Sequence, residues 1–207
     1  MAAALLICIA LCAAPAIYSS MQGMLRLHLL TKPLTTILII VLAASLPATQ
    51  PAPYRALILA GLVFSLAGDI FLMLPRGLFT AGLAAFFIAH LCYIAAFWRL
   101  PLQALWALPV YALYVVVLMR SLWRRIGVLT GAVLGYAVII SLMSWLAWSR
   151  YVALPSQAAL LAGIGSLLFI ASDSILAYDR FVGMAGNQSL GILVTYYAAQ
   201  TLIALSV

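Results

Sequence analysis

The sequence predicts an all-α, polytopic membrane protein built as a bundle of eight transmembrane helices. Of its 207 residues, 68% are hydrophobic and only 6% are charged, and the mean hydropathy is +1.25, far outside the range of soluble domains. Proline, glycine and charged residues divide the chain into segments close to the roughly 20 apolar residues that a transmembrane helix needs. Since the connections are short, we expect a single membrane domain, 1–207, with any chemistry among the helices.

The first four predicted spans end at charged or turn-forming residues. The first resembles a signal peptide, but no Lys or Arg precedes its apolar core, and we interpret it as a span. The second begins beside Lys32 and Pro33, because proline is favoured in the first turn of a helix. Proline, arginine and glycine separate the third span from the fourth. The four ranges are 1–18, 31–46, 54–74 and 78–98.

The last four predicted spans follow the same rule. The arginine-rich stretch "RSLWRR", residues 120–125, separates the fifth from the sixth, and the seventh follows a proline. A predicted loop with Asp179 and Arg180 separates the seventh from the eighth, and we interpret Asp179 as a solvated loop charge. The four ranges are 102–119, 127–148, 156–177 and 188–207.

Positive charge is unevenly distributed between the connections, which predicts the orientation of the chain. Seven Lys and Arg fall in odd-numbered connections and three in even-numbered ones. Because Lys and Arg are enriched on the cytoplasmic side, we expect the odd connections in the cytoplasm and both termini on the opposite side. The ten basic residues are scattered between apolar segments, so the net charge of +7 reflects topology and argues against nucleic-acid binding.

An offset of 104 residues indicates a weak internal repeat, 1–100 against 101–207. It aligns "GLVFSLAGDIFL" with "GSLLFIASDSIL", so that Asp69 meets Asp173, and it pairs Tyr93 with Tyr197. With four spans in each copy, the copies would share one orientation and be related by an axis along the membrane normal. Chance similarity between apolar helices is the alternative.

The two aligned aspartates are the predicted catalytic residues. A charged group within a bilayer span is costly and normally faces a partner or an aqueous cavity, and Asp69 and Asp173 fall at similar depth. Two carboxyls in one pocket of low dielectric do not both ionise easily, so one would donate a proton and the other act as base. The alternative is that each is a structural group paired with an arginine near a helix end, such as Arg26, Arg76 or Arg180.

Other polar residues are placed where they could support these aspartates. Lys32 would meet an aspartate or a lipid phosphate, or act as a snorkelling anchor. His90 and Tyr93, three residues apart on one helix face, would join the pocket or pack in the core. The remaining candidates either line a polar cleft or tie helices together: Tyr136, Ser144, Tyr196, Tyr197 and Gln200.

The sequence predicts neither a cofactor nor a metal site. The chain has no glutamate and only two histidines, so a metal would depend on His90 and the two aspartates. Its three cysteines, Cys8, Cys12 and Cys92, lie in apolar segments without a Cys-x-x-Cys pair, which argues against disulfides and zinc. No Gly-x-Ser-x-Gly, His-Glu-x-x-His or phosphate-binding glycine loop is present.

The motifs "SLAGDIFLM", "LLFIASDSILAYDRF", "YYAAQTLI", the Lys32–Pro33 pair and His-x-x-Tyr together resemble the YhhN-like family, which includes the animal lysoplasmalogenases. The resemblance spans essentially the whole chain. It implies hydrolysis of the vinyl ether bond of a lysoplasmalogen to a fatty aldehyde and a glycerophospho head group, with a lysolipid substrate and membrane lipids as partners. The short loops favour a bacterial member in the inner membrane, with both termini periplasmic. The family's polar positions fall on Lys32, Asp69, His90, Tyr93, Asp173, Tyr197 and Gln200.

Two further functions stay open beside the hydrolase. A proton-coupled transporter of a small amphiphile or metabolite would also have membrane-embedded acids and a parallel repeat. A structural or lipid-binding protein would use the acids only to hold the bundle together. The hydrolase is the leading hypothesis because vinyl ether cleavage needs one proton donor and one anionic base, which two differently tuned carboxyls supply.

Overall fold

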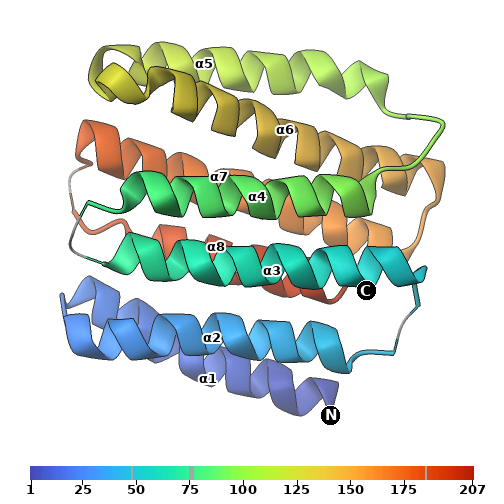
Figure 1. The fold of residues 1–207 in the computed structure, drawn as a ribbon, viewed down its shortest axis with the longest axis horizontal. Coiled ribbons are helices and arrows are strands. Elements are labelled where there is room, and N and C mark those ends of the chain that lie inside the picture. Colours follow the sequence, from blue (N-terminus) through green and yellow to red (C-terminus); the bar gives the residue numbers. More distant parts are fainter. Residues whose placement is uncertain (48, 75–76, 185) are drawn as a thin grey trace.

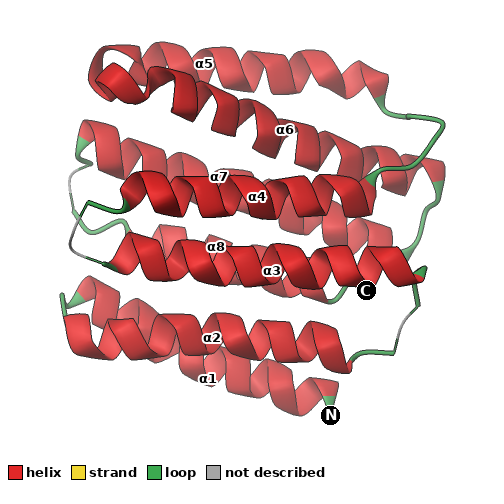
Figure 2. Cartoon of the chain, viewed as in Figure 1, coloured by secondary structure: helices red, strands yellow, loops and turns green. Residues whose placement is uncertain are grey.

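The computed structural model describes residues 1–47, 49–74, 77–184 and 186–207, and every regular element in this part of the chain is helical (Figure 2). The predicted all-α class is confirmed. Two short 3₁₀ turns, η1 (Leu105–Ala107) and η2 (Gly127–Leu129), flank α5. The α-helices are α1 (Ala2–Met21), α2 (Leu25–Ser45), α3 (Ala52–Met73), α4 (Phe79–Phe97), α5 (Leu108–Ile126), α6 (Thr130–Ala153), α7 (Gln157–Val182) and α8 (Ser189–Ala204).

Six helical stretches among the described residues are long and apolar enough to cross a membrane. They are α1, α2, α3, α4, α7 and one continuous stretch, Leu105–Ala153, that contains both α5 and α6. The helix α8 is equally apolar but has only 16 residues. The chain is therefore an integral membrane protein, and eight separate spans stay a prediction.

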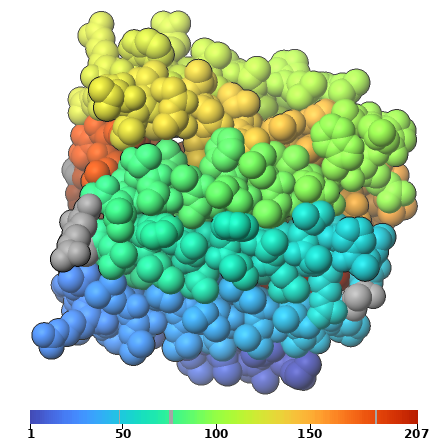
Figure 3. Space-filling view, viewed as in Figure 1, coloured from blue at the N-terminus to red at the C-terminus, as the bar shows by residue number. Residues whose placement is uncertain are grey.

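The helices lie side by side in roughly antiparallel order, with both termini at the same end of the bundle (Figure 1). The α3–α4 and α7–α8 hairpins form the centre, with α1 and α2 on one flank and α5 and α6 on the other. Side chains of α2, α3 and α4 cover one face as adjoining bands (Figure 3). Helices α4 and α6 meet, as do α2 and α8, so each central hairpin contacts both flanks.

Glycines allow the two helices of each central hairpin to approach closely. A Cβ atom on Gly68 of α3 would lie 2.6 Å from the Phe86 ring of α4, and one on Gly165 of α7 would lie 2.9 Å from the Ala199 carbonyl of α8. Since lipid tails are as apolar as leucine, helix association in a bilayer depends on such close packing. These contacts hold Asp69 and Asp173, both on hairpin helices, in fixed positions.

Three expected boundaries were wrong. Helix α2 begins at Leu25, so Lys32 and Pro33 lie inside it, because a proline does not have to start the helix that contains it. Helix α5 runs from Leu108 to Ile126 and holds the arginines of 120–125 in its final turns, where long side chains reach the interface. Asp179 lies in the last turn of α7 rather than in a loop, although it is exposed as expected.

Candidate active site

Asp69, near the end of α3, is a fully buried carboxylate with a cationic partner. Its side chain is 1% exposed, and Oδ1 lies 3.1 Å from the Nζ atom of Lys32 on α2. The other oxygen, Oδ2, accepts hydrogen bonds from the hydroxyls of Thr36 (2.8 Å) and Tyr196 (2.7 Å). Three donors therefore engage both oxygens. The alternative that Asp69 pairs with Arg26 or Arg180 was wrong, and Arg76 lies outside the described residues.

A chain of hydrogen bonds extends from Asp69 into the bundle. Tyr196 accepts a bond from the Gln200 amide nitrogen at 3.3 Å, and the Gln200 oxygen accepts one from Tyr93 at 2.9 Å. Tyr93 and Gln200 are fully buried, so these bonds replace the water that their polar atoms lose. The network joins α3, α4 and α8 behind the carboxylate and fixes its orientation.

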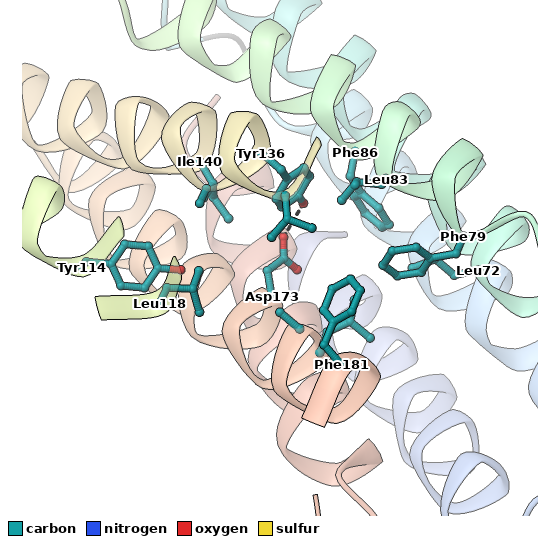
Figure 4. Close-up of a pocket in the computed structure, with 14 residues that line it drawn as sticks. Leu72, Phe79, Leu83, Phe86, Tyr114, Leu118, Tyr136, Ile140, Asp173 and Phe181 are labelled. Atoms are coloured by element: carbon teal, nitrogen blue, oxygen red, sulfur yellow. Dashed lines mark hydrogen bonds between the residues drawn. The ribbon is translucent and has the colours of Figure 1, made fainter. Parts of the chain in front are cut away.

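Asp173, on α7, has a different environment. Its Oδ2 accepts a hydrogen bond from the Tyr136 hydroxyl of α6, and among the described residues no cation forms a salt bridge with it. Figure 4 shows the carboxyl directed into a pocket whose walls carry Phe79, Phe86 and Phe181. One carboxylate is thus neutralised by a lysine, whereas the other has only a neutral partner.

Two cavities meet at Asp173. A polar cavity of about 1170 Å³, counting its open mouth, is lined by both aspartates, Lys32, His28 and the charged end of α7. An apolar pocket of about 590 Å³ lies between α4, α5, α6 and α7 and includes Ile140 among its walls. Asp173 borders both spaces, together with Leu72, Phe79, Phe86 and Leu176. A ligand with a polar and an apolar part would therefore have its junction beside this carboxyl.

His90 and Tyr197 lie in the core rather than on a cavity wall. The His90 ring is fully buried against Tyr93, Tyr136 and Phe169, with ring centroids 6.3, 5.3 and 4.7 Å away. Neither ring nitrogen forms a hydrogen bond within the described part of the chain, although the Phe86 carbonyl lies nearby. The Tyr197 hydroxyl is likewise buried without a hydrogen bond there.

The structure gives positions to residues whose role the sequence did not decide, and to others that the sequence did not predict. Tyr196, left open between a cleft and a helix tie, contacts Asp69 directly. Ser144 instead bonds to Tyr111 and Ser166, away from the cavities. Thr36 and His28 were missed, yet both are four residues from Lys32, and that spacing puts all three on one face of α2. Among the described residues, no group of three or more His, Cys, Asp or Glu lies together as a metal site.

These features define an integral membrane protein in which two aspartates line one polar cavity and one of them also borders an apolar pocket. Comparison with known families identifies it further. The chain belongs to the YhhN family, whose model matches residues 27–207. This match confirms the resemblance inferred from the sequence motifs.

Named relatives come from animals and bacteria. The chain is 35% identical over 162 residues to lysoplasmalogenase TMEM86A of Bos taurus, covering 76% of this chain and 67% of the relative. It is 37% identical over 153 residues to lysoplasmalogenase TMEM86B of Homo sapiens, covering 74% and 64%. It is 32% identical over 151 residues to the membrane protein YhhN of Escherichia coli O157:H7, covering 68% of each chain. The matched region thus spans about two thirds of these relatives, and no solved structure matches the chain significantly.

Proposed function

We propose that this protein is an intramembrane hydrolase that cleaves the vinyl ether bond of lysoplasmalogen-like lysolipids. The observation that carries the proposal is the position of Asp173 at the junction of the polar and the apolar cavity. A lysolipid has the same division, and its vinyl ether joins the glycerophospho head to the hydrocarbon chain. With the head in the polar cavity and the chain in the apolar pocket, the scissile bond lies beside Asp173. The relatives named lysoplasmalogenase support this substrate class.

The reaction needs one proton donor and one water molecule. Protonation of the vinyl β-carbon produces an oxocarbenium ion, and water then adds to the carbon bonded to the ether oxygen. The added water loses a proton, and the resulting hemiacetal collapses to a fatty aldehyde as the glycerol oxygen takes up a proton. The overall change is the addition of one water, with no cofactor in the balance.

The different surroundings of the two aspartates support a division of these roles between them. Asp173 meets one neutral hydroxyl, so its protonated form is not opposed by a cation, and it serves as the general acid. Asp69 is held as an anion by Lys32 and two hydroxyl donors, and it stabilises the oxocarbenium ion and accepts the proton of the attacking water. A carboxylate has about four acceptor positions, and the three bonds to Asp69 leave one for that water.

The experiment is aldehyde release by purified protein from an alkenyl lysophosphoethanolamine. The matching lipid with a saturated ether should release none, because it has no double bond to protonate. We expect Asp173→Asn and Asp69→Asn each to lower kcat by at least about 100-fold, the usual contribution of a positioned acid or base. Ser45→Ala is the control, since Ser45 donates to the Leu42 carbonyl of its own helix and lines neither cavity. Normal turnover by the Asp173 variant would contradict the proposal.

The architecture behind this site is a 4+4 parallel repeat of eight spans with both termini periplasmic. The 104-residue offset that relates Asp69 to Asp173 also relates Lys32 to Tyr136, and each of these residues bonds to the aspartate of its own half. Both pairs join the second helix of a half to the third, which supports the repeat. The excess of arginine at the ends of α5 and α7 supports a cytoplasmic position for the mouth of the polar cavity.

The same repeat favours one competing function, a proton-coupled transporter of an amphiphile. Transport would accumulate the unchanged lysolipid inside proteoliposomes when a proton gradient is applied. The hydrolase releases aldehyde without a gradient. Accumulation without chemical change would favour the transporter and exclude the proposed reaction.

A further inference from the structure

The polar cavity contains two opposite charges that the proposed reaction does not use. Asp179 and Arg180, in the last turn of α7, are exposed, and both line this cavity. Lys32–Asp69 is the one salt bridge among the described residues, so neither Asp179 nor Arg180 has an oppositely charged partner there. We propose that they form the head-group site for a zwitterionic lysolipid, in which Arg180 binds the phosphate and Asp179 the ammonium group. This inference builds on the proposed function and names the head group.

Arg180 is better placed than Lys32 to bind a phosphate. The Lys32 ammonium is 3.1 Å from Asp69 and its side chain is 11% exposed, so it is already engaged. The Cζ atom of Arg180 lies 4.9 Å from the centre of the Phe79 ring. Packing on an aromatic face orients a guanidinium and leaves its N–H groups free for bidentate bonds to phosphate. Because Phe79 lines both cavities, it fixes Arg180 at the border of the polar one.

The spacing along α7 matches the distance that a lysolipid must cover. Asp173 and Arg180 are seven residues apart, which is two helical turns, so their side chains lie on one face about 10 Å apart along the axis. Leu176 lies between them on that face and also lines both cavities. The glycerol backbone would occupy this interval, with its vinyl ether beside Asp173 and its phosphate near Arg180.

The charge balance of the cavity favours a zwitterion over an anion. Lys32 and Asp69 neutralise each other, and Asp179 sits next to Arg180, so the mouth offers one positive and one negative group. In an ethanolamine or choline head group, a short ethylene spacer separates the phosphate from the positive nitrogen. A serine head group adds a carboxylate that Asp179 would repel. The remaining wall includes His28, Asp173 and apolar side chains, together with the hydroxyls of Ser20 and Ser189, which are joined by a 2.8 Å hydrogen bond.

Binding of saturated ether lipids tests this site independently of turnover, because such lipids cannot be protonated and cleaved. The probes are an alkyl lysophosphoethanolamine, the same lipid ending in the bare phosphate, and the alkylglycerol without phosphate. Calorimetry on the full chain in nanodiscs gives Kd for the wild type and for Arg180→Gln and Asp179→Asn. Arg124→Gln is the matched control, an exposed arginine in the last turn of α5 that does not line the polar cavity.

We expect Arg180→Gln to weaken binding of both phosphate lipids about tenfold or more, as the loss of a charge-assisted pair predicts, and to leave the alkylglycerol unchanged. Asp179→Asn should weaken only the ethanolamine lipid. Unchanged Kd values, or an equal loss for the alkylglycerol, would overturn the head-group assignment. If the wild type binds these lipids in this pattern but releases no aldehyde from the vinyl ether, the proposed reaction fails and the head-group site stands.

Discussion

Replacing Lys32 by methionine would remove the counter-charge of a buried carboxylate and keep most of the side-chain volume. At the 3.1 Å separation of Nζ and Oδ1, the attraction is about 5 kcal/mol at an effective dielectric constant of about 20. Removing one partner of a buried pair costs about 3–5 kcal/mol because the other charge stays uncompensated. The hydroxyls of Thr36 and Tyr196 still donate to Asp69, so we expect a loss of about 3 kcal/mol.

The assay is the free energy of unfolding of purified Lys32→Met, Asp69→Asn and the double variant, measured by denaturant titration in the same detergent. The double variant contains neither charge, and it should regain most of the stability that either single variant loses. All three should release little aldehyde, because the anionic base is absent or unpaired. Arg26→Met is the matched control on α2, because Arg26 is exposed and forms no salt bridge with any residue that the structure describes, so its loss should change stability by less than about 0.5 kcal/mol.

Two results would refute this reasoning. If Lys32→Met is as stable as the wild type, the ion pair does not hold α2 against α3. If the double variant is as unstable as the sum of the single variants, the two residues act independently. Lys32 would then not be the reason why Asp69 is held as an anion while Asp173 is not.

Three further changes test the packing of the site and the place of the hydrocarbon chain. Gly68→Ala should lower the free energy of unfolding by about 1–3 kcal/mol, whereas Gly135→Ala, where a Cβ meets nothing within 4 Å, should raise it by up to about 1 kcal/mol. His90→Phe removes two buried ring nitrogens for which the described part of the chain provides no hydrogen bond, so stability should rise by about 1–3 kcal/mol with aldehyde release retained; loss of release in a folded variant would show that the imidazole takes part in the reaction. Ile140→Trp narrows the apolar pocket and should shift kcat/KM toward shorter alkenyl chains, and an unchanged ratio would mean that the chain lies elsewhere.

The fold class and the family followed from the sequence because membrane helices leave a strong signal in composition and length. The boundaries were less predictable, because proline and arginine often mark helix ends but do not do so in α2 and α5. Pro33 lies inside α2, and the arginines of 120–125 lie inside α5. Both residue types are tolerated within a membrane helix, where neighbouring groups or the interface satisfy them. An error of nearly two turns at the start of α2 placed Lys32 at a helix end, whereas it lies well inside the helix and faces Asp69.

The partners of the two aspartates could have been predicted by extending observations already made. Thr36 follows Lys32 by four residues, which places it on the same helix face. Tyr136 follows Lys32 by 104 residues, the same offset that relates Asp173 to Asp69. The core position of His90 was harder to predict, because its distance from the cavities depends on how α4 packs against α6 and α7, and that packing has no local sequence signal.

The proposed repeat explains how one site obtained two carboxyls with different roles. A newly duplicated bundle has identical aspartates in identical surroundings, and although such a pair can share one proton, either residue can hold it, so neither is fixed as acid or base. In the present chain, the position that is Lys32 in the first half is Tyr136 in the second, so one aspartate meets a cation and the other a neutral hydroxyl. One turn further along, Thr36 corresponds to Ile140; the threonine donates to Asp69, whereas the isoleucine lines the apolar pocket. Divergence at two aligned positions would thus create both the difference between the acids and the division between polar and apolar space that an amphiphilic substrate requires.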